Sequence, residues 1–307
     1  MTAAKRVAVL GASGSVGRHV CPALARRGHE VLAIARHPAP QIADYPFLAF
    51  DLGEGAPEKL GRIIDAERID AVVNVAGRSG DSEAELARSY HRLVERLVTA
   101  LEPVPSRPRF VHLGSVHEYG PVPAGTLIGE SLPERPANAY ARAKLAGSRA
   151  VLAATRRGAL NGVVLRTVNT LGPYPPRETF PAALLGLLRT AAVTREPVEL
   201  DVAAAERDFV DVRDLAEALV SAVTAPVEGE VVNIGRGEAV GIADLVAICF
   251  AAAGLPLDLM RLKEAPVRSQ GGDWTCADIR AARRLLGWRP VIGLRDSARA
   301  MWEATDD

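Results

Sequence analysis

Cysteine is scarce in this sequence, with three among 307 residues. Cys21, Cys249 and Cys276 are far apart, and none belongs to a C-x-x-C pair. This spacing is not that of a disulfide framework or of a thiol redox motif. No set of histidines, cysteines and carboxylates has the spacing of metal ligands either, so we expect no metal site.

Neither sign of charge is in excess, because 37 basic and 37 acidic residues leave a formal net charge of zero. No basic block stands out, so nucleic acid is not expected as a partner. Long apolar runs are also missing, since none approaches the ~20 residues that a membrane-spanning helix needs. The first residues lack the basic start, apolar stretch and cleavage site of a signal peptide. We therefore expect a cytoplasmic protein with no membrane partner.

Short apolar runs recur through the first half of the chain, and long Ala-, Leu- and Arg-rich stretches separate several of them. The runs lie at 6–11, 30–35, 46–51, 70–77, 109–115 and 162–167, and the two longest helical stretches lie at 82–101 and 138–157. Strands without polar alternation, separated by helices, indicate a parallel sheet that is buried on both faces. With right-handed crossovers, this pattern predicts an α/β fold with a Rossmann-type doubly wound sheet.

This rhythm ends after residue 167, where the proline-rich stretch 172–181 is unsuited to regular structure. Helices at 182–192 and 212–224, a buried strand at 230–235 and a last helix ending near residue 290 are predicted beyond it. We predict that residues 1–169 and 206–235 form the sheet domain. Residues 170–205 and 236–307 would then form a smaller, discontinuous lobe that caps the carboxyl edge of the sheet.

A glycine-rich turn follows the first predicted strand. G-A-S-G-S-V-G places Gly11, Gly14 and Gly17 at the start of a helix. Glycine permits a tight turn and close approach of the backbone, and a helix N-terminus presents free N–H groups to a pyrophosphate. We therefore predict a dinucleotide-binding turn whose other contacting residues are Ser13, Ser15 and Val16.

The end of the second predicted strand bears on the choice of dinucleotide. An NAD site usually has an acidic residue there, which accepts hydrogen bonds from the ribose hydroxyls. This chain has Arg36 and His37, and Arg18 directly follows the last glycine of the turn. Because cationic side chains suit a 2′-phosphate, we predict NADP(H) as the cofactor in preference to NAD(H).

A tyrosine and a lysine lie four residues apart in N-A-Y-A-R-A-K, in a chain with only five tyrosines and four lysines. That spacing puts Tyr140 and Lys144 on one face of a helix, one turn apart. Together with the glycine spacing G-x-x-G-x-x-G and the N-V-A-G at 74–77, the pair resembles the short-chain dehydrogenase/reductase superfamily. The resemblance implies that Tyr140, Lys144 and Ser115, at the end of the fifth strand, form the catalytic set.

The same resemblance implies further contacts with the cofactor. Tyr140 and Lys144 would themselves touch it, Lys144 at the ribose hydroxyls. Five other residues would line the cofactor: Asp51, Leu52, Val75, Ala76 and Gly77. Of these, Asp51 and Leu52 would lie beside the adenine.

The chemistry of ketone reduction explains these residue types. Adding hydride to a ketone builds negative charge on its oxygen, so a proton must arrive there. A free tyrosine has a pKa of ~10, and a nearby ammonium together with the oxidised nicotinamide is expected to lower it. We therefore expect Lys144 to lower the pKa of Tyr140, while Ser115 orients and hydrogen-bonds the carbonyl oxygen.

Later motifs resemble the extended branch of the superfamily, the NAD-dependent epimerase/dehydratase family, whose members act on nucleotide sugars. The motifs are S-V-H-E-Y-G at 115–120, L-R-T-V-N-T-L-G-P at 165–173, R-D-F-V-D-V-R-D-L-A-E-A-L at 207–219, V-V-N-I-G at 231–235 and L-L-G-W-R-P at 285–290. The resemblance implies a nucleotide-sugar substrate, with Arg207 gripping the diphosphate and Asn169 near the sugar or its phosphate. His117 and Arg268 are further candidates for contact with the substrate.

Three departures from the motifs of the family's subgroups narrow the choice of reaction. Ser115, Val116 and His117 stand where sugar 4,6-dehydratases carry Thr-Asp-Glu, so the acid pair that removes water is missing. Tyr174 stands where the epimerase–reductases carry a histidine, and Arg36 argues against a 4-epimerase that retains NAD. The sequence most resembles dTDP-4-keto-6-deoxyhexose 4-ketoreductases, which use NADPH in deoxysugar biosynthesis.

Two alternatives stay open at the level of sequence. One is a nucleotide-sugar 4-epimerase with retained NAD, and the other is a ketoreductase for a polyketide-type ketone, which would not need Arg207. Family members usually dimerise through helices that correspond to 82–101 and 138–157, so the resemblance also implies a homodimer.

Overall fold

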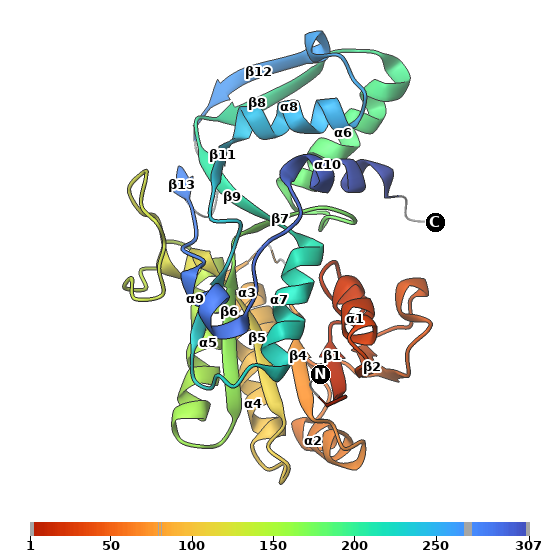
Figure 1. The fold of residues 1–307 in the computed structure, drawn as a ribbon, viewed down its shortest axis with the longest axis vertical. Helices are drawn as coiled ribbons and strands as arrows, with labels where there is room; N and C mark the ends of the chain where they lie inside the picture. Colours follow the sequence, from red (N-terminus) through yellow and green to blue (C-terminus); the bar gives the residue numbers. More distant parts are fainter. Residues whose placement is uncertain (1–2, 79, 81, 267–271, 305–307) are drawn as a thin grey trace.

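The computed structural model describes residues 3–78, 80, 82–266 and 272–304. Its largest element is a seven-stranded sheet in which every neighbouring pair is parallel (Figure 1). In sheet order, the strands are β10 (Val231–Ile234), β6 (Asn161–Thr167), β5 (Arg109–Ser115), β4 (Ala71–Asn74), β1 (Arg6–Leu10), β2 (Glu30–Ala35) and β3 (Phe47–Ala49). The predicted α/β fold with a Rossmann-type parallel sheet is thereby confirmed.

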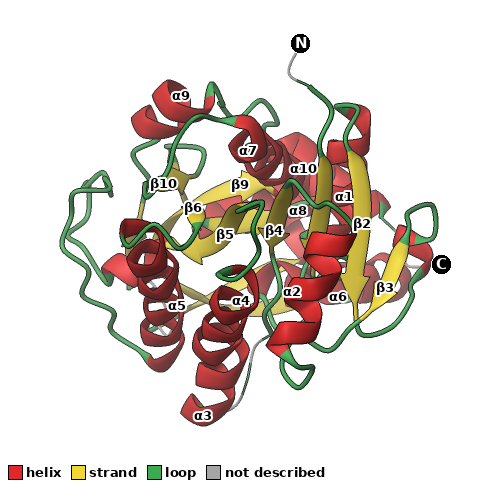
Figure 2. Ribbon diagram, turned by 90° about the horizontal axis from the view of Figure 1, so that it is seen from below, coloured by secondary structure: helices red, strands yellow, loops and turns green. Residues whose placement is uncertain are grey.

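Both faces of this sheet are covered by helices, which is why its strands lack polar alternation (Figure 2). Val7 and Val9 of β1 point into one core, whereas Ala8 and Leu10 point into the other. The first face is covered by α1 (Gly17–Arg26) and α7 (Val212–Thr224), and the second by α2 (Pro57–Ala66), α4 (Leu93–Leu101) and α5 (Ala139–Arg156). Because neighbouring strands are parallel, their carboxyl ends meet along one edge of the sheet.

The stretch predicted as a single helix at 82–101 is interrupted. It comprises α3 (Glu83–Leu86), a π-helical segment η2 (Ala87–Arg92) and α4. Tyr90 of η2 packs so closely on Gly77 that a Cβ at residue 77 would lie 2.4 Å from the tyrosine ring. Short π-helical segments inside α-helices frequently mark functional sites, so this interruption directs attention to Tyr90.

A smaller lobe stands beyond the carboxyl edge of the main sheet (Figure 1). It contains one sheet of β7 (Asn169–Leu171), β9 (Glu206–Asp211), β11 (Ala239–Gly241) and β13 (Trp274–Thr275), and a second sheet of β8 (Val198–Ala203) and β12 (Met260–Ala265). Its own hydrophobic core lies among α6 (Phe180–Thr194), α8 (Ile242–Ala252) and α10 (Leu294–Glu303). Short 3₁₀ turns complete the elements at η1 (Pro40–Ile42), η3 (Val116–Tyr119) and η4 (Leu257–Leu259).

Two segments bear on the predicted division between the lobes. β9, within the range 206–235 predicted for the sheet domain, pairs with strands of the smaller lobe. Conversely α9 (Arg280–Leu286) packs on β10 and α7, and Trp288 belongs to the core of the main sheet. The chain therefore passes repeatedly between the lobes, which ties them together along the carboxyl edge.

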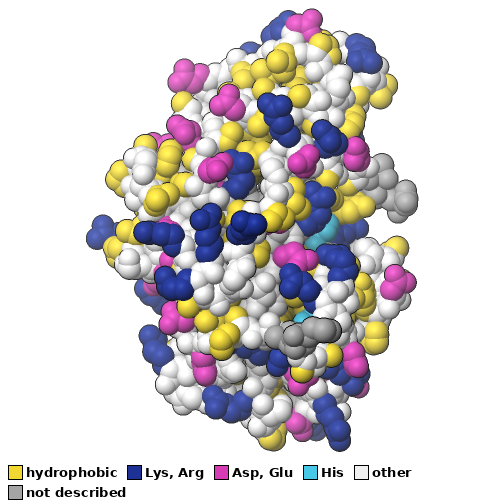
Figure 3. All heavy atoms as spheres, viewed as in Figure 1, with side chains coloured by type: hydrophobic (Ala, Val, Ile, Leu, Met, Phe, Trp, Pro, Cys, Tyr) yellow, Lys and Arg dark blue, Asp and Glu magenta, His cyan; other side chains and the backbone are white. Residues whose placement is uncertain are grey.

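The surface carries both signs of charge, as the balanced composition requires. On the face drawn in Figure 3, basic and acidic side chains are interspersed over both lobes. Within the described residues, no helix has the length and apolar character needed to cross a membrane. In the same part of the chain, no group of three or more His, Cys, Asp or Glu residues is arranged to hold a metal ion.

Candidate active site

The glycine turn is held by close backbone contacts. Gly11 has a φ of +81°, and a Cβ there would lie 2.8 Å from the Cα of Ala76. A Cβ on Gly17 would lie 2.2 Å from the carbonyl oxygen of Gly11, so α1 starts directly against the turn. The N–H of Gly14 donates to that same carbonyl at 3.0 Å. Only glycine fits at 11 and 17 without displacing the backbone, which leaves the turn open to a ligand.

A cavity of about 370 Å³ lies beside this turn, at the carboxyl ends of β2, β3 and β4. Nine of the residues predicted to contact a cofactor line it: Gly11, Ser13, Gly14, Arg36, Asp51, Leu52, Val75, Ala76 and Gly77. The lining also includes residues that the sequence analysis did not identify: Ala35, Phe50, Gly53, Glu54, Arg78, Arg88, Ser89 and Leu93. The space is bounded by backbone, apolar side chains, two serines, two carboxylates and three arginines, a mixed lining that fits a dinucleotide.

The predicted cations differ in where they lie. Arg36 is exposed and lines the cavity. Two further exposed arginines line it as well: Arg78, which follows β4, and Arg88, which lies in η2. Arg18 instead lies over the ring of Tyr174, with its guanidinium carbon 3.7 Å from the ring centroid. His37 is exposed but is not among the residues that line the cavity. Arg36 is therefore the one of these three that lines the cavity, and a role at a 2′-phosphate stays a prediction for all three.

The loop after β4 is ordered by a buried asparagine. Asn74 accepts a hydrogen bond from the N–H of Ala76 at 3.1 Å, and its side-chain nitrogen lies 3.1 Å from Nδ1 of His112. Asp51 has a comparable local role, because one carboxylate oxygen accepts the N–H groups of Gly53 and Glu54. These contacts shape the wall of the cavity from within the chain.

The three predicted catalytic residues converge beyond the end of β5. Ser115 ends that strand, and Asn138 caps α5, whose first turn carries Tyr140. The Tyr140 ring meets Tyr90 edge-on at 5.2 Å between centroids, and the His117 ring lies 6.1 Å away. Lys144 is buried, and its ammonium donates to the carbonyl oxygen of Leu113 at 2.6 Å. The structure thus brings a hydroxyl, a phenol and an ammonium to one place.

The charge states of this set differ from the expectation. Burial raises the pKa of Tyr140, Tyr90 adds to the rise, and the hydrogen bond with Ser115 opposes it. Burial also lowers the pKa of Lys144 to about 8, against the opposing charge of Glu118. The expectation of a lowered tyrosine pKa included the oxidised nicotinamide as well as the lysine. In the polypeptide alone, desolvation of the phenolate dominates and raises the pKa of Tyr140. The phenol is consequently held in its protonated form.

His117 faces the same space from η3. Burial, followed by the positive charge of Arg207, lowers the pKa of this histidine to about 4, so the imidazole is neutral near pH 7. Its Nδ1 is buried and finds no hydrogen-bond partner within the described residues. A neutral imidazole with a spare ring nitrogen can hydrogen-bond a polar ligand.

The predicted substrate residues of the smaller lobe lie on adjacent strands. Arg207 of β9 is buried and donates to the carbonyl oxygen of Gly272. Asn169 lies on β7, which pairs with β9, and donates to the carbonyl oxygen of Asp208 at 3.4 Å. Arg268 lies outside the described residues.

Comparisons with known proteins agree with this geometry. A profile of the NAD dependent epimerase/dehydratase family matches residues 7–235. The chain is 37% identical to dTDP-6-deoxy-L-talose 4-dehydrogenase (NAD(P)(+)) of Kitasatospora kifunensis, over 99% of this chain and 96% of that protein. It is 28% identical to GDP-6-deoxy-D-mannose reductase of Pseudomonas aeruginosa, over 98% of both.

The chain belongs to the NAD-dependent epimerase/dehydratase family. Solved structures show the same fold: MoeE5 in complex with UDP-glucuronic acid and NAD superimposes with a TM-score of 0.83 at 28% identity, covering 97% of this chain and 98% of that one. RMD from Pseudomonas aeruginosa complexed with NADPH gives a TM-score of 0.79 at 25% identity, with the same coverage. This member of the family is an NAD(P)-dependent oxidoreductase.

Family membership connects the two parts of the site. The open glycine turn and the cavity beside it fit an NAD(P) molecule, which would be held by the backbone at 11–17 and by residues 75–77. Tyr140 and Lys144 are not among the residues that line the cavity, and contacts between them and the cofactor stay a prediction.

The buried histidine gives this oxidoreductase a pH-dependent stability. Since the pKa of His117 falls from 6.5 to about 4 on folding, the unfolded chain binds the proton first as pH drops. The free energy of unfolding is therefore unaffected by this group above pH 6.5. It falls by about 3 kcal/mol as the pH drops from 6.5 toward 4. His112, whose pKa burial also lowers, adds to the slope in the same direction.

We expect His117→Asn to flatten this pH dependence by roughly 2–3 kcal/mol in urea unfolding curves recorded between pH 7 and pH 4. The exposed His37→Asn, outside the cavity, is the matched control and should retain the wild-type slope. An unchanged slope in the His117 variant would show that the imidazole is hydrated in the folded protein.

Proposed function

We propose that this enzyme uses NADPH to reduce the C4 ketone of a nucleotide-linked 4-keto-6-deoxyhexose, with dTDP as the nucleotide. The observation that carries the proposal is the 37% identity, over almost the full length of both chains, to a dTDP-6-deoxy-L-talose 4-dehydrogenase. A 4-dehydrogenase and a 4-ketoreductase act on the same carbon–oxygen bond in opposite directions. The convergence of Ser115, Tyr140 and Lys144 supplies the groups that this bond requires.

Reduction places a hydride on carbon and a proton on oxygen. A bound NADPH supplies the hydride, and the protein must supply the proton. Tyr140 is the candidate donor because its phenol is protonated near neutral pH and hydrogen-bonds with Ser115 at the start of α5. Ser115 stabilises the developing negative charge by hydrogen bonding, and Lys144, largely protonated near neutral pH, adds positive charge. Transfer of the phenol proton then completes the alcohol.

The substrate would lie between this set and the smaller lobe. We infer that Arg207 binds the diphosphate and that Asn169 contacts the sugar or its phosphate, as in the family resemblance. The positive charge of Arg207 contributes to the lowered pKa of His117, which supports the inference that the two side chains face a common space. Neutral His117 would then hydrogen-bond the sugar without adding a second cation beside the ketone.

A panel of nucleotide sugars tests the proposal. Wild-type enzyme should oxidise NADPH when given a dTDP-4-keto-6-deoxyhexose, and the product should carry a hydroxyl at C4 by NMR. Interconversion of C4 epimers by enzyme that retains NAD, without net NADPH consumption, would instead assign a 4-epimerase. Reduction of simple ketones but of no nucleotide sugar would assign the non-nucleotide class.

The proposal includes a preference for NADPH that depends on Arg36. Arg36 is exposed at the end of β2 and lines the cavity, where it can donate to a 2′-phosphate. A charge-assisted hydrogen bond contributes about 1.5–3 kcal/mol, or roughly 10- to 150-fold. We expect kcat/KM to favour NADPH over NADH by at least about tenfold, and Arg36→Ala to remove most of this by weakening NADPH alone.

Arg62→Ala removes the same charge from an exposed position on α2 that does not line the cavity, and it should keep the wild-type preference. Equal weakening of NADPH and NADH by Arg36→Ala, or equal use of both by wild type, would assign Arg36 to the solvated surface.

We also propose a homodimer formed through α4 and α5, as the family resemblance implies. The supporting feature is an open groove between these helices, lined by His91, Glu95, Pro136, Arg142, Leu145, Ala146, Arg149 and Ala150. Sedimentation of the purified protein as a monomer at micromolar concentration would contradict it.

A further inference from the structure

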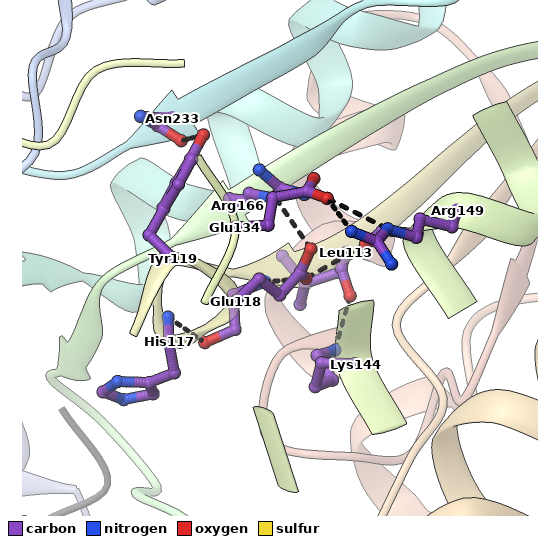
Figure 4. A network of polar contacts seen from close by, with 11 residues as sticks. Leu113, His117, Glu118, Tyr119, Glu134, Lys144, Arg149, Arg166 and Asn233 are labelled. Carbon is purple, nitrogen blue, oxygen red and sulfur yellow. Dashed lines mark hydrogen bonds and ion pairs between the residues drawn. The ribbon is translucent and has the colours of Figure 1, made fainter. Parts of the chain in front are cut away.

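One buried carboxylate contacts all the parts of the chain that carry the catalytic set. Glu118 lies in η3, directly after β5, and its side chain is fully buried. One carboxylate oxygen accepts the N–H of Ser115 at 2.8 Å and the hydroxyl of Ser148 at 3.0 Å. The other oxygen accepts Nε of Arg166 at 2.7 Å (Figure 4). A single side chain thus bridges the end of β5, helix α5 and strand β6.

The contact on α5 falls on the catalytic face of that helix. Tyr140, Lys144 and Ser148 follow one another at intervals of four residues, so they share one side of the helix. The hydrogen bond from Ser148 to Glu118 therefore fixes α5 one turn beyond Lys144. Because the same oxygen also holds the backbone of Ser115, it sets the distance between the serine and the tyrosine–lysine pair.

Arg166 of β6 holds the carboxylate through an ion pair. Its buried guanidinium pairs with both Glu118 and Glu134, and lies 4.5 Å from the ring centroid of Tyr119. The phenol of Tyr119 donates to Asn233 on β10 at 3.0 Å, which extends the network to the next strand (Figure 4). A buried charge with this many partners is well determined in position, and losing one partner would leave another unpaired.

The charge of Glu118 acts on both titrating groups of the site. It raises the pKa of Tyr140, behind the effects of burial and Tyr90, and it raises the pKa of Lys144 against burial. The polar or titratable groups that face this pair from the packed elements are Tyr90 on η2, His112, the Leu113 carbonyl and Ser115 on β5, and His117 and Glu118 on η3. Among them, Glu118 is the carboxylate that also holds Ser115 and α5 in place.

We propose that Glu118 is a positioning residue. It fixes Ser115 against the face of α5 that carries Tyr140 and Lys144, and its negative charge acts on these two side chains. The inference rests on the proposed function in taking Tyr140 as the proton donor. Glu118 belongs to the S-V-H-E-Y-G motif, and the sequence pattern alone predicts no role for it. Glu118 acts through its neighbours and is not required to touch the substrate.

Glu118→Gln tests the charge, because glutamine keeps the size and one acceptor oxygen. In the reductive direction, activity falls as Lys144 and Tyr140 lose their protons. Glu118 raises the pKa of both groups, so this high-pH limb of the kcat/KM profile should move to lower pH in the variant. We expect kcat to fall roughly tenfold or more, because misplacement of reacting groups is costly, while KM for the ketone changes little.

Two variants separate positioning from stability. Glu134→Gln also removes a carboxylate from Arg166 but touches neither Ser115 nor Ser148, so it should lower the melting temperature without moving the pH limb. Ser148→Ala removes only the tie to α5, and should lower kcat severalfold with the pH limb in place. If Glu118→Gln does not fold, unchanged kcat in Ser148→Ala overturns the proposal.

A readout without substrate separates this inference from the proposed function. The ultraviolet absorbance of tyrosinate, with Tyr140→Phe as the blank, reports ionisation of Tyr140 directly, and it should begin at lower pH in Glu118→Gln. Failure of the wild type on every nucleotide sugar would sink the proposed function alone. A melting temperature lowered by Glu118→Gln, with wild-type kcat and wild-type tyrosinate titration, would make Glu118 purely structural.

Discussion

Tyr140→Phe is expected to lower kcat by roughly 10²-fold or more, with the dissociation constant for NADPH little changed. Phenylalanine keeps the ring that meets Tyr90 edge-on at 5.2 Å, so the packing at the start of α5 is retained. Only the hydroxyl that would deliver the proton is removed. Steady-state assays with the ketone, together with a fluorescence titration of NADPH, measure both quantities.

Tyr45→Phe is the matched control, since Tyr45 is half-buried beside η1 and packs against the core of the main sheet, away from α5. The same hydroxyl deletion there should leave kcat unchanged. Turnover near the wild-type value in Tyr140→Phe would exclude Tyr140 as the proton donor, and the Glu118 inference would lose its basis with it.

Gly17→Ala is expected to destabilise the fold by about 3 kcal/mol and to weaken NADPH binding roughly tenfold or more. The added methyl group would lie 2.2 Å from the carbonyl oxygen of Gly11 and 2.7 Å from the Cα of Ala12. Both are backbone atoms that cannot rotate away, so α1 must shift relative to the turn. Denaturant unfolding and NADPH titration of the same preparation report the two effects.

Gly186→Ala provides the opposite control. Gly186 is exposed within α6, and nothing lies within 4 Å of the Cβ position. Alanine there should stabilise the protein by about 0.5–1 kcal/mol, since it favours the helix without a clash. If Gly17→Ala also proved neutral, the turn would have room to relax and the close contact would not govern binding.

Local patterns were enough to predict the main sheet. The apolar runs at 6–11, 30–35, 109–115 and 162–167 match β1, β2, β5 and β6 within one residue at each end. They could be identified because both faces of a parallel sheet demand continuous apolar sequence. β3 and β4 are shorter than their runs, since strand ends depend on where neighbours stop pairing.

Other features depend on contacts between distant residues, which no local pattern encodes. The π-helical turn that delivers Tyr90 to Gly77 lies in a stretch whose periodicity reads as plain helix. Likewise β9 follows a pattern suited to either sheet, and only its partners β7, β11 and β13 place it in the smaller lobe.

The sequence by itself determined the fold class, the glycine turn and the pairing of Tyr140 with Lys144, because each depends on spacing within one segment. Only the tertiary structure decided the charge states and the support of the site. Tyr140 was expected to have a lowered pKa, but burial among η2, η3 and β5 raises it. Glu118 looked like one polar residue in a motif until folding enclosed it with Ser115, Ser148 and Arg166. Desolvation and hydrogen bonds of this kind are set by residues brought together from several elements, and they exist only once the chain has packed.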